Sequence, residues 1–422
     1  MKIPGWWRVR HFYYRVIEFF KEISKYIDRR HEDYLYWKNK NKVVKEGVNI
    51  IGFAKGDFGL AEHMRLVTHS VKTTIIKFCV NDSSLSGDHS VGNKELVDYI
   101  IDENPFRINL FCYNPNFIFH YMKDSHKGKI AVKKHYNISY GYWELSKYPK
   151  DWNEQNSYMQ EIWAPSKFIK EVIEKETPLP VFYMPIPVDF VIPTGHTRTQ
   201  FGLPENRFLF LFTFDLSSVI HRKNPEAVIE AFTRAFPSER KDGVALVIKI
   251  NRIKSNEQQG LKVAELREQV SFDDRILLID EVLDRSSILG LINVCDAYVS
   301  LHRSEGFGLG MAEAMKMGKV VIGTNYSGNT DFMNAENSCL VNYKLMDVKK
   351  EEYVFVEDGA QWADPDIDHA AEYMQKVYSD PALVKRLGMA AKEYMDNHRN
   401  FKVIGENYQK RLNEIEFEQR RI

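Results

Sequence analysis

The sequence predicts an α/β protein in which two doubly wound units, each a parallel sheet covered by helices, face one another across a cleft. Three observations lead to this expectation. The chain has 422 residues, whereas single hydrophobic cores rarely grow beyond about 250–300 residues. After residue 45, short β-branched runs alternate with helical patterns. This alternation stops at a Pro-rich stretch, 184–189, and a polar stretch, 194–199, and then starts again.

The alternation predicts the strands of each unit. In the first unit they are Val48–Phe53, Thr74–Phe78, Ile108–Cys112, Ile138–Tyr142 and Glu161–Ala164. In the second unit they are Phe208–Phe214, Ala245–Ile250, Ile276–Ile279, Ala297–Leu301 and Val320–Ile322, with helices expected at Pro225–Ala235 and Gly308–Met317. We therefore divide the chain into a helical extension (1–45), two Rossmann-like domains (46–190 and 191–402) and a final polar helix (403–422).

Composition excludes several classes of protein. The 58 basic side chains balance the 58 acidic ones, and 44% of the residues are hydrophobic. A disordered chain would be poorer in apolar residues, and a protein that binds nucleic acid would usually be strongly basic. We therefore expect a folded protein with no nucleic-acid partner.

The balanced charge conceals a basic N-terminal segment. Residues 1–43 contain eleven Lys and Arg but five Asp and Glu, so this segment carries +6 and the remainder of the chain −6. At about 100° per residue, 11–30 form an amphipathic helix with apolar side chains such as Phe12, Phe19 and Ile23 on one side. Two interpretations stay open: the helix binds an anionic membrane surface, with Trp6 and Trp7 at the interface, or it packs on its own domain.

The cysteines and the absence of long apolar runs bear on location. Four cysteines, Cys79, Cys112, Cys295 and Cys339, are widely spaced and resemble buried apolar residues of a reducing compartment. No apolar run approaches the roughly 20 residues of a membrane-spanning helix, and charges interrupt every apolar stretch near the N-terminus. We expect a cytoplasmic protein, peripheral on the inner face of the membrane if residues 1–43 bind lipid.

The most informative segment runs from Ser300 to Gly318. A predicted strand is followed by a glycine-rich turn and then by a helix. The backbone N–H groups of Phe307, Gly308 and Leu309 can point at an anion, helped by the helix dipole. Glu305 lies in the turn and Glu313 lies in the helix, so two carboxylates flank this anion site and can accept hydroxyl hydrogen bonds. A nucleotide-sugar presents these groups, because it has hydroxyls on either side of a diphosphate.

Basic side chains follow the first strand of the same unit. Arg222 and Lys223 can neutralise the charge of a diphosphate, while Asn224 and Pro225 suit the N-cap and N1 positions of the next helix. Lys249, at the end of the following strand, is a weaker candidate for the donor site.

The first unit offers its own candidates. Gly56 and Gly59 lie in a strand–loop–helix segment and would let the backbone approach a ligand across the cleft. Asn114 and His120 follow another strand, and His120 is the candidate histidine, although an isolated histidine is more often structural.

These segments together resemble a known family. Glu305-Gly-Phe-Gly-Leu-x-x-x-Glu313-Ala-Met is similar to the signature of retaining glycosyltransferases of the family 4 type, which have the GT-B fold. Tyr142-Trp-Glu-Leu, Glu161-Ile-Trp-Ala-Pro-Ser-Lys-Phe168 and Arg222-Lys-Asn-Pro225 resemble the bacterial polysaccharide branch of that family. The resemblance spans about residues 46–415.

The resemblance implies roles for the candidate residues. A nucleotide-sugar donor would bind mainly the second domain and a glycan or lipid-linked glycan acceptor mainly the first, and the final helix would cross back to the first domain. Glu305 would hold the hydroxyls of the donor sugar, Glu313 the ribose, and Lys223 with Arg222 the diphosphate. The donor side would also include Gly306, Phe307, Gly308, Leu309, Gly56 and Gly59. Glu144 is a candidate for the acceptor wall, and either Asn114 or His120 would take the place of the family's active-site histidine.

The sequence also departs from the family pattern. The loop Phe214–Val219 lacks the Arg that the family usually places before its Lys, and Asp331 stands where the family often has Glu. An Asp-x-Asp pattern at Asp364 and Asp366 could suggest a metal, but it precedes a helix (370–378), so N-capping explains it better.

The residues and the resemblance together imply a retaining glycosyltransferase that uses a nucleoside diphosphate sugar, without an obligatory metal or other cofactor, in surface polysaccharide or lipid-linked oligosaccharide synthesis. Two alternatives remain open: a sugar-nucleotide epimerase of the same fold, and a catalytically silent scaffold that binds nucleotide-sugar.

Overall fold

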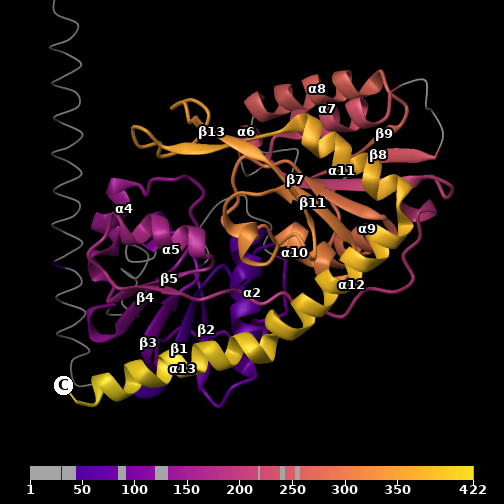
Figure 1. Ribbon diagram of the computed structural model, residues 1–422. Coiled ribbons are helices and arrows are strands. Elements are labelled where there is room, and N and C mark those ends of the chain that lie inside the picture. Colours follow the sequence, from indigo (N-terminus) through magenta and orange to yellow (C-terminus); the bar gives the residue numbers. More distant parts are fainter. Residues whose placement is uncertain are drawn as a thin grey trace, which may run out of the picture.

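The computed structural model describes residues 30, 44–83, 92–118, 132–216, 219–237, 243–251 and 257–421. Within these ranges the chain forms two parallel sheets, each with helices packed on it (Figure 1). The amphipathic helix expected at residues 11–30 lies outside the described residues apart from Arg30, so the interpretation of the N-terminal extension stays a prediction.

The first sheet has six parallel strands in the order β2-β1-β3-β4-β5-β6. They are β1 (Lys45–Gly52), β2 (Phe78–Asp82), β3 (Phe106–Phe111), β4 (Tyr136–Tyr140), β5 (Glu161–Ala164) and β6 (Val181–Tyr183). In the interior strand β1, Ile50 pairs with Val80 on one side and with Leu110 on the other. Such buried apolar residues are typical of parallel strands that helices cover on both faces.

The helices of the first half connect its strands. They are α2 (Gly59–Lys72), α4 (Lys150–Gln155) and α5 (Lys167–Glu174). Helix α5 begins where the sequence provides a cap, because the hydroxyl of Ser166 accepts a hydrogen bond from the N–H of Ile169.

The second sheet repeats this construction with the strand order β12-β11-β10-β7-β8-β9. Its strands are β7 (Phe208–Asp215), β8 (Val244–Asn251), β9 (Ile276–Ile279), β10 (Ala297–Ser300), β11 (Val320–Thr324) and β12 (Cys339–Val341). Its helices are α6 (Ile220–Lys223), α7 (Pro225–Ala235), α8 (Glu257–Ser271), α9 (Arg285–Val294), α10 (Leu309–Lys316), α11 (Ile367–Ser379) and α12 (Pro381–His398). The carboxyl ends of β7 and β10, which pair with each other, therefore lie at one edge of the sheet.

The prediction of two doubly wound units is confirmed, and one predicted strand is wrong. Thr74–Phe78 was expected to form a strand, but β2 begins only at Phe78. The hydroxyls of Thr73 and Thr74 donate hydrogen bonds to the carbonyls of Ser70 and Val71, so these threonines close the end of α2. The β-branched pair therefore ends a helix and does not start a strand.

Four strands were not expected from the sequence. Strands β6 and β12 lie at the edges of the first and second sheets, and β13 (Tyr343–Asp347) and β14 (Gln361–Pro365) form an antiparallel hairpin outside both sheets. We call residues 343–365 the hairpin segment. In Figure 1 it projects from the second half towards α4 of the first half.

The last helix, α13 (Phe401–Gln419), returns to the first half and lies along the lower side of the first sheet in Figure 1. The Tyr408 hydroxyl lies 3.0 Å from the hydroxyl of Tyr140 on β4, and Arg411 pairs with the fully buried Glu161 on β5 at 2.6 Å. Gly405 lies against α2, where an added Cβ would stand 2.4 Å from the Ser70 carbonyl oxygen. Only glycine permits this approach.

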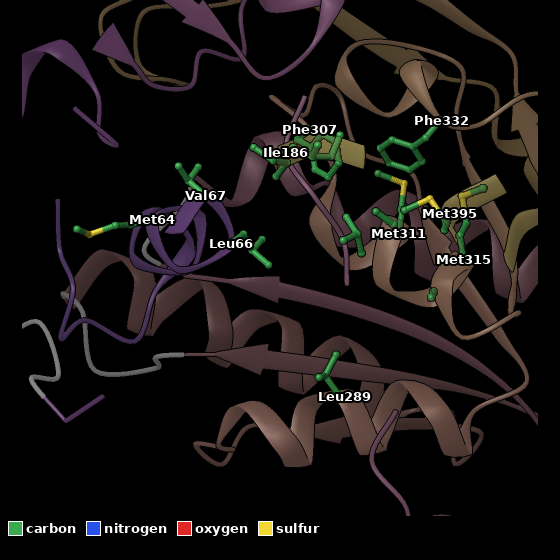
Figure 2. Packing of buried hydrophobic residues seen from close by; sticks show 14 of the residues in the cluster. Met64, Leu66, Val67, Ile186, Leu289, Phe307, Met311, Met315, Phe332 and Met395 are labelled. Atoms are coloured by element: carbon green, nitrogen blue, oxygen red, sulfur yellow. The ribbon is translucent and has the colours of Figure 1, made fainter. Parts of the chain in front are cut away.

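A continuous hydrophobic cluster joins the two halves. It includes Met64 and Val67 from α2, Ile186 from the segment between the sheets, and Phe307 and Met311 from the second half. Figure 2 shows these side chains, with Ile186 beside Phe307 and the methionines of α10 and α12 beyond them. The shared cluster fixes how the two sheets face each other.

Membrane and thiol features can be stated for the described part of the chain. None of its helices has both the length and the apolar character needed to cross a bilayer. All four cysteines lie in described ranges as buried, free thiols, as the sequence predicts.

Candidate active site

The loop after β10 is fixed by side chains from two neighbouring loops. Buried His302 lies with Nε2 3.0 Å from Oδ1 of Asn329, and the hydroxyl of Thr324 donates to the carbonyl of His302 at 2.7 Å. Asn224 donates through its side chain to the carbonyl of Leu301 at 3.0 Å. These hydrogen bonds therefore hold the loop that carries Glu305 in place without any ion pair.

The glycine-rich turn leads directly into α10, as predicted. Gly308 takes a φ of +95°, a conformation that favours glycine, and α10 begins at Leu309. The buried ring of Phe307 packs on Phe332 with centroids 5.0 Å apart, and Gly306 is buried beside the Tyr142 ring. The turn thus places the N-terminus of α10 next to Glu305.

Arg222, Lys223 and Glu305 form a compact charge cluster. Lys223 Nζ lies 2.5 Å from Oε1 of Glu305, and Arg222 Nη1 lies 3.1 Å from Oε2. Arg222 also donates to the carbonyl of Ser304 at 2.7 Å. Both cations come from α6, directly after β7, and the carboxylate comes from the loop after β10. Predicted residues 82 positions apart therefore meet at the carboxyl edge of the second sheet.

The cluster determines the charge of its members. Burial alone would raise the pKa of Glu305, but Arg222 and Lys223 outweigh burial and hold that pKa well below its usual range. Burial lowers the pKa of Arg222, but Glu305 and Glu144 more than offset it, so the guanidinium stays charged. Glu305 is consequently an ionised carboxylate that can accept several hydrogen bonds.

Glu313 lies in a second charged group. Its Oε1 is 2.5 Å from Arg285 on α9, and the same guanidinium lies 3.3 Å from Glu62 on α2 of the first half. Burial raises the pKa of Glu313, and Arg285 partly opposes this effect. One arginine therefore links a predicted donor-binding carboxylate to the opposite half of the molecule.

The predicted residues of the first half lie in two places. Gly56 lies in the loop before α2, where its carbonyl accepts from Arg65 at 2.7 Å, and Gly59 is the first residue of α2. Glu62, in the first turn of the same helix, reaches Arg285. The two glycines therefore lie on the loop and helix that meet the Glu313 group.

Asn114 and Glu144 lie in the loops that follow the adjacent strands β3 and β4. Asn114 Oδ1 accepts from the N–H of Tyr142 at 2.8 Å. Glu144 Oε1 lies 3.9 Å from Arg222 Nη2, so Glu144 faces the Arg222 cluster across the interface between the halves. His120 lies outside the described residues.

Two expectations differ in detail from the structure. Lys249 is fully buried on β8 and donates to the carbonyls of Ile250 and Glu281, both at 2.7 Å, so these carbonyls already hold its ammonium group. Asn224 occupies the N-cap position of α7, but its side chain makes no capping hydrogen bond there. It adopts a φ of 56° and bonds to Leu301.

Sequence reasoning missed three polar residues of the site. Arg285 follows an ordinary helix N-cap, Asp284, and nothing near it in the sequence marks its contact with Glu313. The Ser327 hydroxyl accepts from the N–H of Glu305 at 2.8 Å, and the Tyr353 hydroxyl donates to Glu144 at 2.9 Å. The turn-forming Asn325–Asn329 segment marked Ser327 as a loop residue, whereas Tyr353 lies in a hairpin without strand-like alternation.

The second aspartate of the Asp-x-Asp pattern caps a helix. The Asp366 side chain accepts from the N–H of His369 and caps α11, as the sequence predicts. Among the described residues, no group of three or more His, Cys, Asp or Glu side chains is arranged to hold a metal ion. Independence from metal stays a prediction.

Comparisons with known proteins agree with this architecture. Residues 196–394 match the family model of glycosyl transferases group 1. A serotype-specific mannosyltransferase, WbdA of Escherichia coli, is 24% identical over 153 residues, which cover 36% of this chain and 18% of that protein. The match thus spans less than a fifth of that relative.

Solved structures show the same fold. Sucrose-phosphate synthase from Thermosynechococcus elongatus superposes with a TM-score of 0.63 at 12% identity, covering 88% of this chain and 99% of the other. HepE of Anabaena, in complex with UDP and glucose, gives a TM-score of 0.62 at 11% identity, covering 88% and 100%. The two sheets therefore form a GT-B fold.

Proposed function

We propose that the protein transfers a glycosyl group from a nucleoside diphosphate sugar to a hydroxyl of a glycan, with retention of anomeric configuration as in family 4. One observation carries the proposal. Arg222 and Lys223 converge on Glu305 in the loop that leads into α10, at the carboxyl edge of a sheet whose domain matches glycosyl transferases group 1. Two cations and a helix N-terminus suit a diphosphate, and an ionised carboxylate suits sugar hydroxyls.

The existing ion pairs suggest how a donor would be accepted. Glu305 is paired with both cations, so their charges are already partly neutralised. A diphosphate carries more charge than one carboxylate and would compete for the same cations. Its binding would release the oxygens of Glu305 to accept hydrogen bonds from the donor sugar, and the same cations would then stabilise the departing diphosphate.

The remaining predicted residues take supporting parts in this proposal. Glu313 would hold the ribose after exchanging part of its contact with Arg285, and Gly56 and Gly59 would approach the donor from the first half. Glu144 would form part of the acceptor wall with Asn114. The acceptor class follows from the polysaccharide branch that the sequence resembles.

Substitutions at Glu305 and Lys223 test the proposal. Glu305→Gln and Lys223→Ala should each lower turnover by about 10²–10³-fold, because each removes a charge that the transition state needs. Turnover is measured with GDP-mannose, UDP-glucose and UDP-N-acetylglucosamine as donors and p-nitrophenyl glycosides as acceptors, with and without EDTA. Exposed residues of α12 supply the matched controls Glu393→Gln and Lys385→Ala.

The possible outcomes separate the alternatives. Proton NMR of the product gives its anomeric configuration, and inversion would contradict retention. A donor that is isomerised without acceptor would identify an epimerase. Nucleotide-sugar binding in a thermal-shift measurement without turnover of any donor would favour the scaffold. Normal transfer by both site variants would remove Glu305 and Lys223 from the mechanism.

We further propose that residues 1–43 bind an anionic membrane surface and hold the cleft near a lipid-linked acceptor. The proposal is supported by the +6 charge and the tryptophans of that segment. Deleting residues 1–43 should abolish sedimentation with phosphatidylglycerol liposomes while transfer to a soluble glycoside continues. A truncated protein that fails to fold would instead show that the segment belongs to the domain.

A further inference from the structure

The hairpin segment belongs to the second half of the chain but packs on the first. Lys150, at the start of α4, donates through its backbone N–H to the Glu357 carboxylate, and Ser146 donates through its N–H to the carbonyl of Gln361. Rings from both sides meet in one cluster, with Tyr353 6.0 Å from Trp143. The segment therefore forms a wall over the part of the first half that carries Glu144.

Glu144 is restrained from both halves at this wall. The Tyr353 hydroxyl donates to Oε2 of Glu144 at 2.9 Å. The Ser304 hydroxyl, from the loop that also carries Glu305, donates to the backbone carbonyl of Glu144. The second carboxylate oxygen, Oε1, faces Arg222 at 3.9 Å, beyond hydrogen-bond distance. The Tyr353 phenol thus holds the Glu144 carboxylate close to the Arg222 guanidinium without allowing a hydrogen bond between the two charged groups.

Backbone conformation gives independent evidence for a functional site in this region. Among the described residues, three non-glycine positions have positive φ: Asn224, Ser327 and Phe355. Asn224 directly follows Lys223, the Ser327 hydroxyl accepts from the N–H of Glu305, and Phe355 lies two residues after Tyr353, with its ring 5.7 Å from that of Trp152 in a tilted arrangement. Such conformations persist where surrounding contacts enforce them, and they concentrate at functional sites.

We infer that Tyr353 is a positioning residue that holds Glu144 at the acceptor edge of the cleft. This inference rests on the proposed transfer to a glycan hydroxyl. The Tyr353 phenol keeps one Glu144 oxygen engaged, so the carboxylate cannot turn onto Arg222. Arg222 then remains with Glu305, where the donor diphosphate is proposed to bind, and Glu144 remains available to an acceptor hydroxyl.

The geometry gives the expected direction of the effect. Without the phenol, Glu144 can approach Arg222 from 3.9 Å, because the attraction of opposite charges grows as the distance shortens. The carboxylate would then leave the acceptor position. Acceptor kinetics should suffer most, since the contacts of Lys223 with Glu305 do not involve Tyr353.

The test is a double-mutant cycle between Tyr353→Phe and Glu144→Gln. It uses the donor and p-nitrophenyl glycoside that give turnover with the wild type. Tyr353→Phe should lower kcat/KM for the acceptor by about tenfold to hundredfold, the effect of losing one hydrogen bond to a charged group. The Kd for the corresponding nucleoside diphosphate should stay within about twofold of the wild type. In the Glu144→Gln background, Tyr353→Phe should add less than about threefold.

Matched controls separate positioning from folding. Tyr343→Phe removes a hydroxyl from the same hairpin segment, at a half-exposed tyrosine whose ring packs on Tyr326, and should leave acceptor kinetics unchanged. Thermal unfolding of each variant reports on the fold. If Tyr353 served the fold alone, Tyr353→Phe would lower stability and would reduce kcat/KM by the same factor in the presence and absence of the Glu144 carboxylate.

Three results would overturn the inference: unchanged acceptor kinetics in Tyr353→Phe, a loss that adds in full to that of Glu144→Gln, or an equal loss of nucleoside diphosphate affinity. Each of these presupposes an active wild type. A wild type that binds nucleotide-sugar but transfers no sugar would contradict the proposed function itself, so the two failures are distinguishable.

Discussion

His63 lies on α2 with a ring that is 1% exposed. Its Nδ1 is 2.9 Å from the hydroxyl of Tyr142, and the ring stands edge-on to Tyr140 at 4.5 Å. Burial lowers the pKa of His63 from 6.5 to about 3, a shift that a hydrogen bond to the Tyr140 backbone only partly opposes. The imidazole is therefore neutral in the folded protein throughout the physiological range.

This depressed pKa predicts a stability that depends on pH. The unfolded chain binds a proton at His63 more readily than the folded chain does. The contribution of the neutral ring is therefore complete above pH 6.5 and is lost as the pH falls towards 3. Between pH 7 and pH 5, the loss of this contribution should lower the unfolding free energy of the wild type by about 2 kcal/mol. Urea unfolding at both pH values measures the loss.

The comparison variant is His63→Gln, which cannot take up the proton but keeps a polar group near Tyr142. Its unfolding free energy should fall by about 2 kcal/mol less than that of the wild type over the same interval. His398→Gln, at an exposed histidine of α12, is the matched control. Equal losses in the wild type and His63→Gln would show that His63 is not the group responsible.

Individual site residues differ in how far the sequence reveals them. Glu305, Arg222 and Lys223 could be predicted, because each directly follows a strand and the ends of neighbouring parallel strands meet at one edge. Arg285 and Tyr353 could not, because no motif around either residue marks its contact with a carboxylate. Tyr353 and Glu144 are 209 residues apart, and no local pattern encodes their contact.

Helix α13 shows how one position controls the packing of an element. Gly405 lies where α13 meets α2, and an added Cβ would stand 2.4 Å from both the Ser70 carbonyl oxygen and the Thr73 hydroxyl. Alanine is the better helix former by about 1 kcal/mol, so helix propensity alone would favour the substitution. The steric conflict acts in the opposite direction and involves a backbone atom that cannot rotate away.

Gly405→Ala should therefore destabilise the protein by a net of about 1–3 kcal/mol, since α13 must shift from α2. Gly260→Ala in α8 is the matched control, because there an added Cβ would meet no described atom within 4 Å. That substitution should stabilise the protein by about 0.5–1 kcal/mol. Thermal unfolding followed by circular dichroism measures both. A Gly405→Ala variant at least as stable as the wild type would contradict the close approach of the two helices.

At the scale of elements, the sequence predicts strands and helices well where burial is continuous. Helix α7 and strand β9 begin and end as expected, because proline starts the helix and an apolar run defines the strand. The hairpin segment was missed because β13 is mostly exposed and lacks an apolar alternation. Its apolar contacts lie across the domain interface, which no periodicity within the segment can indicate.

At the scale of the whole molecule, the two halves are joined by more than a linker. The hairpin segment packs on the Trp143 cluster, α13 packs on α2, and Arg285 connects Glu62 with Glu313. Arg399 adds a hydrogen bond to the Tyr183 hydroxyl. Two of these connections end in residues proposed to contact substrate, so the geometry of the proposed site depends on the relative position of the halves.

The hairpin segment also limits how this molecule can be rebuilt from parts. A boundary drawn by sheets alone would assign residues 343–365 to the donor half, yet Trp362 is fully buried in the cluster that also holds Trp143 and Trp152. Grafting residues 196–394 onto an unrelated first half would leave this apolar surface without its complement. A functional chimera must therefore exchange the hairpin segment and α13 together with the acceptor half, so the units of recombination differ from the units of the fold.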